Sequence, residues 1–89
     1  METVGRELTV LYMDEDRARE GRIDRLLRDG DRLVVLDYKS GKPDPDRVVR
    51  DSEQVRRYCR LVREAMGSEA EGLLWYVDVD TDEAVPVEA

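Results

Sequence analysis

The sequence has no histidine, no phenylalanine and a single cysteine, Cys59. A lone cysteine excludes an internal disulfide and is typical of a reducing compartment, so we expect a cytoplasmic protein. Without histidine, a bound metal would have oxygen ligands, which favours magnesium, manganese or calcium over zinc. No apolar run approaches the ~20 residues that cross a bilayer, and we expect no membrane contact. No glycine-rich phosphate loop is present, so the chain itself should not bind ATP.

Charge is abundant and unevenly spread. The 89 residues, enough for one small domain, are 42% charged and carry a net charge of −7. An acidic balance argues against nucleic acid as a partner. The middle of the chain nevertheless gathers arginines, at positions 47, 50, 56, 57, 60 and 63. The sequence therefore does not exclude a local basic face on this acidic protein.

The pattern of apolar and turn-forming residues predicts an α+β domain. We expect three strands, a loop with two prolines, one helix and two further strands, with the helix packed on one face of a mixed sheet. The expected strands are Glu7–Met13, Glu20–Leu27, Arg32–Lys39, Gly72–Val79 and Glu83–Val87; the loop is Ser40–Arg50 and the helix Asp51–Met66. Asp51 is the expected N-cap and Gly67 the expected end of this helix, whose apolar stripe is Val55, Cys59, Val62 and Met66.

The segment LDYKSGK, Leu36–Lys42, ends a buried strand with an acid and a base two residues apart. Asp37 and Lys39 should therefore point to the same face of the sheet. A hairpin tip at Gly30-Asp31 places Asp24 directly opposite Asp37, whereas a tip at Asp29-Gly30 places it diagonally. A three-residue loop would need a bulge to restore this geometry. Two carboxylates beside a lysine suit magnesium-dependent phosphodiester hydrolysis, while the plainer interpretation of Asp37 and Lys39 is an ion pair at a solvated strand end.

The expected helix carries Gln54 and Tyr58 four residues apart, on one face. Both side chains can hydrogen-bond a phosphate or a water near a metal. The alternatives are a capping box for Gln54, three residues after Asp51, and a core position for Tyr58.

Taken together, GRIDRLL, LVVLDYKSGK and QVRRY resemble, in order, the motifs of the RecB-like branch of the PD-(D/E)XK nuclease superfamily. The resemblance covers roughly residues 20–76. It implies a restriction-endonuclease-like fold, metal ligands at Asp24 and Asp37, a catalytic lysine at Lys39, and helix-motif residues Gln54 and Tyr58 beside the site. It also implies a DNA substrate cleaved in the manner of an exonuclease, Mg²⁺ or Mn²⁺ as cofactor, and a helicase domain in the same or a partner chain.

One departure from this family is expected to matter. The family's helix before the first strand has no counterpart here, which indicates an excised piece of a longer nuclease or a trimmed version. An uncovered apolar sheet face would then promote self-association.

Further basic residues are candidates for contact with DNA phosphates. Lys42, Arg47 and Arg50 lie near the expected site and are the better candidates. For Arg56, Arg60 and Arg63 we favour the solvated face of an amphipathic helix. The leading hypothesis is a magnesium-dependent deoxyribonuclease domain; the second is an inactive nuclease-like fold that binds DNA or protein, and the last is an unrelated acidic interaction domain.

Overall fold

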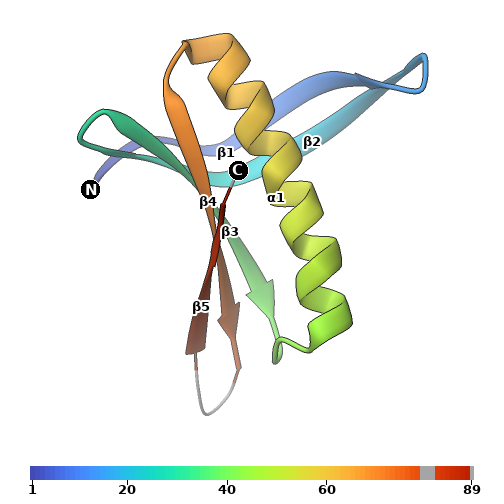
Figure 1. Cartoon of the computed structure of the whole chain (residues 1–89), viewed down its shortest axis with the longest axis vertical. Helices are drawn as coiled ribbons and strands as arrows, with labels where there is room; N and C mark the ends of the chain where they lie inside the picture. Colours follow the sequence, from blue (N-terminus) through green and yellow to red (C-terminus); the bar gives the residue numbers. More distant parts are fainter. Residues whose placement is uncertain (79–81, 89) are drawn as a thin grey trace.

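The computed structural model describes residues 1–78 and 82–88, which form five strands and one helix in the order β-β-β-α-β-β (Figure 1). The elements are β1 (Glu2–Asp14), β2 (Arg17–Asp29), β3 (Arg32–Ser40), α1 (Pro45–Met66), β4 (Glu69–Val77) and β5 (Asp82–Val87). The strands lie side by side in chain order. The β3–β4 pair is parallel and the others are antiparallel, so the predicted mixed sheet and α+β class are confirmed.

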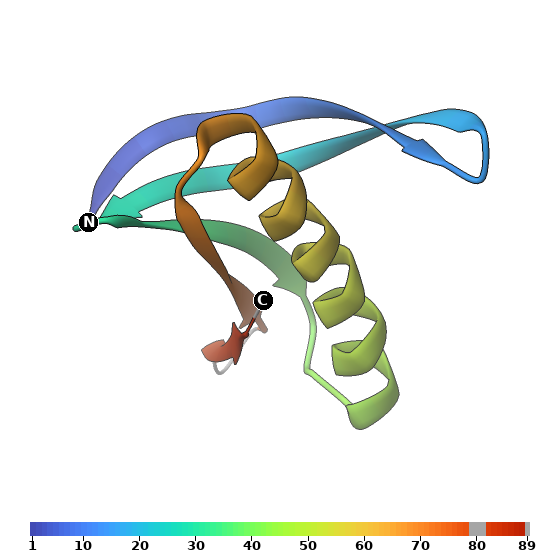
Figure 2. The ribbon, with the colours of Figure 1, turned by 45° about the horizontal axis from the view of Figure 1, so that its top comes forward.

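Several strands extend beyond the predicted bounds. β1 begins at Glu2 instead of Glu7, and β4 begins at Glu69 instead of Gly72. Val79, the predicted end of the fourth strand, lies outside the described residues. The β1–β2 hairpin is the longest part of the sheet, and its tip reaches past the helix (Figure 2).

The β2–β3 turn fixes the register on which the site depends. Asp29 pairs with Arg32, so the tip is the two residues Gly30-Asp31, and Gly30 has the positive φ of 62° that such turns require. Of the registers considered, the structure therefore has the one that directs Asp24 toward Asp37.

The helix begins six residues before the predicted start. Asp44 is the N-cap, and its Oδ1 accepts the backbone N–H of Arg47 at 2.9 Å. The prediction of a loop here was wrong because Pro45 occupies the first turn of the helix, where its missing N–H costs nothing. Asp51 is thus an interior helical residue. The predicted end is confirmed, because Gly67 is left-handed with φ 66° and donates its N–H to Arg63.

Helix α1 lies on one face of the sheet and builds the core there (Figure 2). Val55 and Cys59 are fully buried in one cluster with Leu33, Val35 and Leu74. The fourth member of the predicted stripe is not buried, since Met66 is 45% exposed. Burial raises the pKa of the Cys59 thiol to about 11, so this cysteine is a protonated core side chain and not a nucleophile. No helix among the described residues is long and apolar enough to span a bilayer.

Candidate active site

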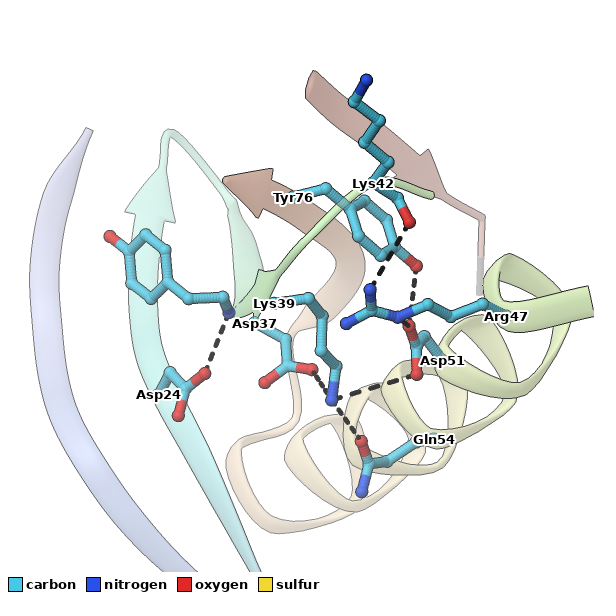
Figure 3. Close-up of polar contacts among 9 residues, drawn as sticks. Asp24, Asp37, Lys39, Lys42, Arg47, Asp51, Gln54 and Tyr76 are labelled. Carbon is cyan, nitrogen blue, oxygen red and sulfur yellow. Dashed lines mark hydrogen bonds and ion pairs between the residues drawn. The ribbon is translucent and has the colours of Figure 1, made fainter. Parts of the chain in front are cut away.

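Asp24 and Asp37 meet where the ladder between β2 and β3 ends. The paired positions run from Asp29 with Arg32 to Arg25 with Leu36. Beyond this pair, the N–H of Tyr38 on β3 donates to a side chain of β2: it is accepted by Asp24 Oδ2 at 2.9 Å (Figure 3). The Asp37 carboxyl group neighbours that of Asp24 and forms an ion pair with Lys39 at 2.9 Å.

A local break in β1 and β2 accompanies this arrangement. The pairs Arg6–Arg25 and Leu8–Ile23 flank Glu7, whose φ of 49° is left-handed. Ile23 and Leu26 are both buried in the core, although residues three apart in a regular strand point to opposite faces. The break at Asp24 therefore turns its carboxylate out of the regular ladder and toward β3.

Asp37 is a buried carboxylate with an unusual pKa. Its side chain lies between β3 and the helix, and the residue is 7% exposed. The pKa of Asp37 is raised to about 6, chiefly by burial and also by the neighbouring Asp24 carboxyl, while Lys39 acts in the opposite direction. Two carboxyl groups so close together disfavour double ionisation unless a cation lies between them.

Lys39 is held among three oxygen-bearing side chains (Figure 3). Its Nζ lies 2.9 Å from Asp37 Oδ2, 3.4 Å from Gln54 Oε1 and 4.0 Å from Asp51 Oδ1. The structure thus brings Asp37, Lys39 and Gln54 together, as the sequence motifs predict. Gln54 uses its carbonyl oxygen on Lys39, so its NH₂ group stays available as a donor.

Asp51 and Tyr76 form the back of the site, and sequence reasoning missed both. The Tyr76 hydroxyl donates to Asp51 Oδ2 at 2.8 Å, and burial with this hydrogen bond raises the pKa of Tyr76 to about 12. Arg47 Nε lies 3.5 Å from the same Asp51 oxygen, and its guanidinium lies 5.1 Å from the centre of the Tyr76 ring. Asp51 had been assigned to a helix cap; its spacing of three from Gln54 would have placed it on the site face once the helix was extended.

The remaining candidates are placed differently. Tyr58 is 4% exposed, which agrees with the core alternative. Arg47 is engaged by Asp51 and Tyr76, and its Nη1 donates to the Lys42 carbonyl at 3.4 Å. The Lys42 side chain points away from the carboxylates (Figure 3), and Arg50 is exposed on the helix.

The donor set fits a hard divalent cation. Asp37 Oδ2 is buried, and the Lys39 ammonium 2.9 Å away is the partner that the described residues give it. Asp24 supplies a second carboxylate beside it. Neither acid belongs to a group of three or more acids, cysteines or histidines within residues 1–78 and 82–88. Two carboxylates without nitrogen or sulfur ligands suit Mg²⁺ or Mn²⁺, which keep several waters.

Comparisons with known proteins identify the fold and the family. No curated protein shows significant similarity to the sequence. A solved structure titled "Crystal structure of SSO0001" superposes with a TM-score of 0.67 at 19% identity, over 94% of this chain and 41% of that chain. The likeness shows a shared fold, and the chain spans less than half the length of that protein. The family model described as "PD-(D/E)XK nuclease superfamily" matches residues 3–88. The chain therefore belongs to the PD-(D/E)XK nuclease superfamily.

Proposed function

We propose that this chain is a Mg²⁺- or Mn²⁺-dependent deoxyribonuclease domain that hydrolyses phosphodiester bonds. The observation that carries the proposal is the meeting of Asp24 and Asp37 beside Lys39, whose Nζ lies 2.9 Å from the buried Asp37 Oδ2. The resemblance to RecB-like nucleases extends the proposal to exonuclease-type cleavage in the cytoplasm, beside a helicase domain of the same or a partner chain in recombination or repair.

The residues of the site have distinct parts in this proposal. Asp24 and Asp37 would hold the cation, which when bound supplies Lewis-acid activation of water and of the phosphate. Lys39 forms an ion pair with Asp37 and lies 4.0 Å from Asp51, and its remaining N–H groups would orient the attacking water or stabilise charge on a phosphate oxygen. Gln54, with its carbonyl engaged by Lys39, donates from its NH₂ group to a phosphate oxygen.

The experiment that tests this proposal combines metal binding with cleavage. The wild-type chain and the variants Asp37→Asn and Lys39→Ala are incubated with end-labelled linear duplex and single-stranded DNA in Mg²⁺, Mn²⁺ or EDTA. Mn²⁺ affinity is measured separately. We expect metal-dependent cleavage by the wild type, loss of Mn²⁺ binding in Asp37→Asn, and loss of cleavage in Lys39→Ala on the order of 100-fold or more with Mn²⁺ binding retained.

Asp31→Asn, in the exposed β2–β3 turn, is the matched control and should behave as the wild type. Mn²⁺ binding without cleavage of any DNA would support the second hypothesis, an inactive nuclease-like fold that binds DNA or protein. Absence of both would exclude a metal-dependent nuclease site.

A further inference from the structure

The outer face of α1 has four arginines around a shallow hollow that is separate from the carboxylate site. The hollow has a volume of about 430 Å³ and is lined by Glu53, Arg56, Arg57, Arg60 and Arg63. This concentration of positive charge is unusual for a chain with 22 acidic residues and a net charge of −7.

In the described part of the chain, the hydrogen bonds of the arginines on this face go to uncharged groups. Arg56 Nε donates to the backbone carbonyl of Glu88 at 3.1 Å, and Arg57 Nη1 donates to the Tyr12 hydroxyl at 3.3 Å. The Arg57 guanidinium also lies 5.4 Å from the centre of the Tyr12 ring. All of these partners are uncharged. Within the described part of the chain, none of the four arginines forms an ion pair with a carboxylate.

The arginines are continuous with the candidate active site. Gln54, whose amide contacts Lys39, is followed at steps of three by Arg57, Arg60 and Arg63. Residues three apart are neighbours on a helix surface and form an inclined ridge. Each step rises about 4.5 Å along the helix and turns back by about 60°, so the row leads from Gln54 to Arg63 over about 14 Å, of which the three arginines span about 9 Å. We call Arg57, Arg60 and Arg63 the arginine ridge.

We propose that the arginine ridge binds the sugar-phosphate backbone of the DNA strand as it leaves the site, an inference that rests on the proposed nuclease function. Successive phosphates of one strand advance about 3.4 Å along a duplex axis, so the ridge spans the backbone of several nucleotides. The substrate is then a polynucleotide that continues for several residues on one side of the cleaved bond. A terminal mononucleotide or dinucleotide would not reach the ridge.

The ordinary alternative is a solvated helix face, and the salt dependence of binding separates the two. The full chain is titrated in EDTA with labelled DNA of roughly 2 and 20 nucleotides, over a series of salt concentrations. We compare the wild type with Arg60→Gln/Arg63→Gln and with Arg28→Glu on β2, which changes the net charge equally. Melting curves establish that each variant is folded.

For long DNA, the ridge variant should bind roughly ten-fold more weakly, with a plot of log K against log salt that is less steep by about 2. Its affinity for the short DNA should equal that of the wild type. The proposal would be overturned if the Arg60→Gln/Arg63→Gln variant bound long DNA as tightly as the wild type. It would also be overturned if Arg28→Glu weakened binding of long DNA equally.

Cleavage assays separate this inference from the function on which it rests. If the wild type binds long DNA through the ridge but cleaves nothing in Mg²⁺ or Mn²⁺, the ridge stands and the nuclease proposal fails. If the wild type cleaves DNA and the ridge variant has an unchanged KM for long substrates, the ridge fails and the nuclease proposal stands.

Discussion

The hydroxyl of Tyr58 lies in the space that a side chain on Gly21 would occupy. A Cβ added to Gly21 would be 2.5 Å from the hydroxyl oxygen and 2.8 Å from Cε1 of the ring. Tyr58 is 4% exposed, so the ring has little room to move away. The glycine of the GRID segment and the tyrosine of the QVRRY segment are thus two sides of one contact, which packs α1 against β2 next to Asp24.

Replacing Gly21 by alanine should therefore destabilise the fold and disturb the site together. We expect Gly21→Ala to lower the free energy of unfolding, measured in urea, by about 1–3 kcal/mol through overpacking. In a double-mutant cycle with Tyr58→Leu, the alanine should cost less, because the ring that it meets is gone. Additive effects of the two substitutions would show that the predicted clash is relieved in another way.

Asp37 should make the metal-free protein less stable as the pH rises. Its carboxyl has a pKa of about 6 in the folded protein, above the ordinary value of 3.8 that applies to the unfolded chain. Between about pH 4 and 6 the folded state binds more protons, so the free energy of unfolding falls as the pH increases through this window. In EDTA, Asp37→Asn should become progressively more stable relative to the wild type from pH 4 to pH 7.

With metal present, the wild type should become more stable than Asp37→Asn, because the cation binds the charged carboxylates of the folded state only. Mg²⁺ or Mn²⁺ should raise the melting temperature of the wild type and leave that of Asp37→Asn unchanged. Equal shifts in both proteins would place the cation elsewhere.

Asp51 and Tyr76 should act as positioning residues for Lys39. Asp51→Asn removes the second negative charge near the ammonium group, and Tyr76→Phe removes the hydrogen bond that orients Asp51. We expect kcat for DNA cleavage to fall about ten-fold or more in Asp51→Asn and less in Tyr76→Phe, with KM and Mn²⁺ affinity nearly unchanged.

Asp31→Asn removes a charge from the exposed β2–β3 turn and is again the control for this comparison. A fall in melting temperature that accounts for the lost activity in Asp51→Asn, or a parallel loss of Mn²⁺ binding, would contradict a positioning role.

Local rules predicted the element order and the register of the central hairpin. Gly30-Asp31 has the composition of a two-residue turn, and the structure places Asp29 opposite Arg32 as that turn requires. The alternation of β3 then predicted correctly that Asp37 and Lys39 share a face. These features depend on residues near one another in the chain, where turn chemistry and strand period dominate.

The remaining details depend on long-range packing and could not be predicted. The orientation of the Asp24 carboxylate depends on the N–H of Tyr38, a residue of another strand. The place of Asp51 depends on where the helix begins, and Pro45 was mistaken for a loop residue although it suits a first helical turn. The ring of Tyr76 is buried as an apolar strand residue would be, and its hydroxyl reaches Asp51 only through the packing of β4 against the helix.

Asp24 combines two tasks that substitution can separate. Its Oδ2 accepts the Tyr38 N–H, and its charge lies beside Asp37. Asp24→Asn keeps an acceptor for the N–H but removes the charge, so the fold should keep its stability, the pKa of Asp37 should fall, and Mn²⁺ binding should be lost. Asp24→Ala removes the acceptor as well, and we expect a further loss of about 1–3 kcal/mol in the free energy of unfolding. Urea unfolding, NMR titration of the Asp37 carboxyl and Mn²⁺ titration measure the three effects separately. Retained Mn²⁺ affinity in Asp24→Asn would remove this residue from the cation site and leave it only the role of holding β3 in place.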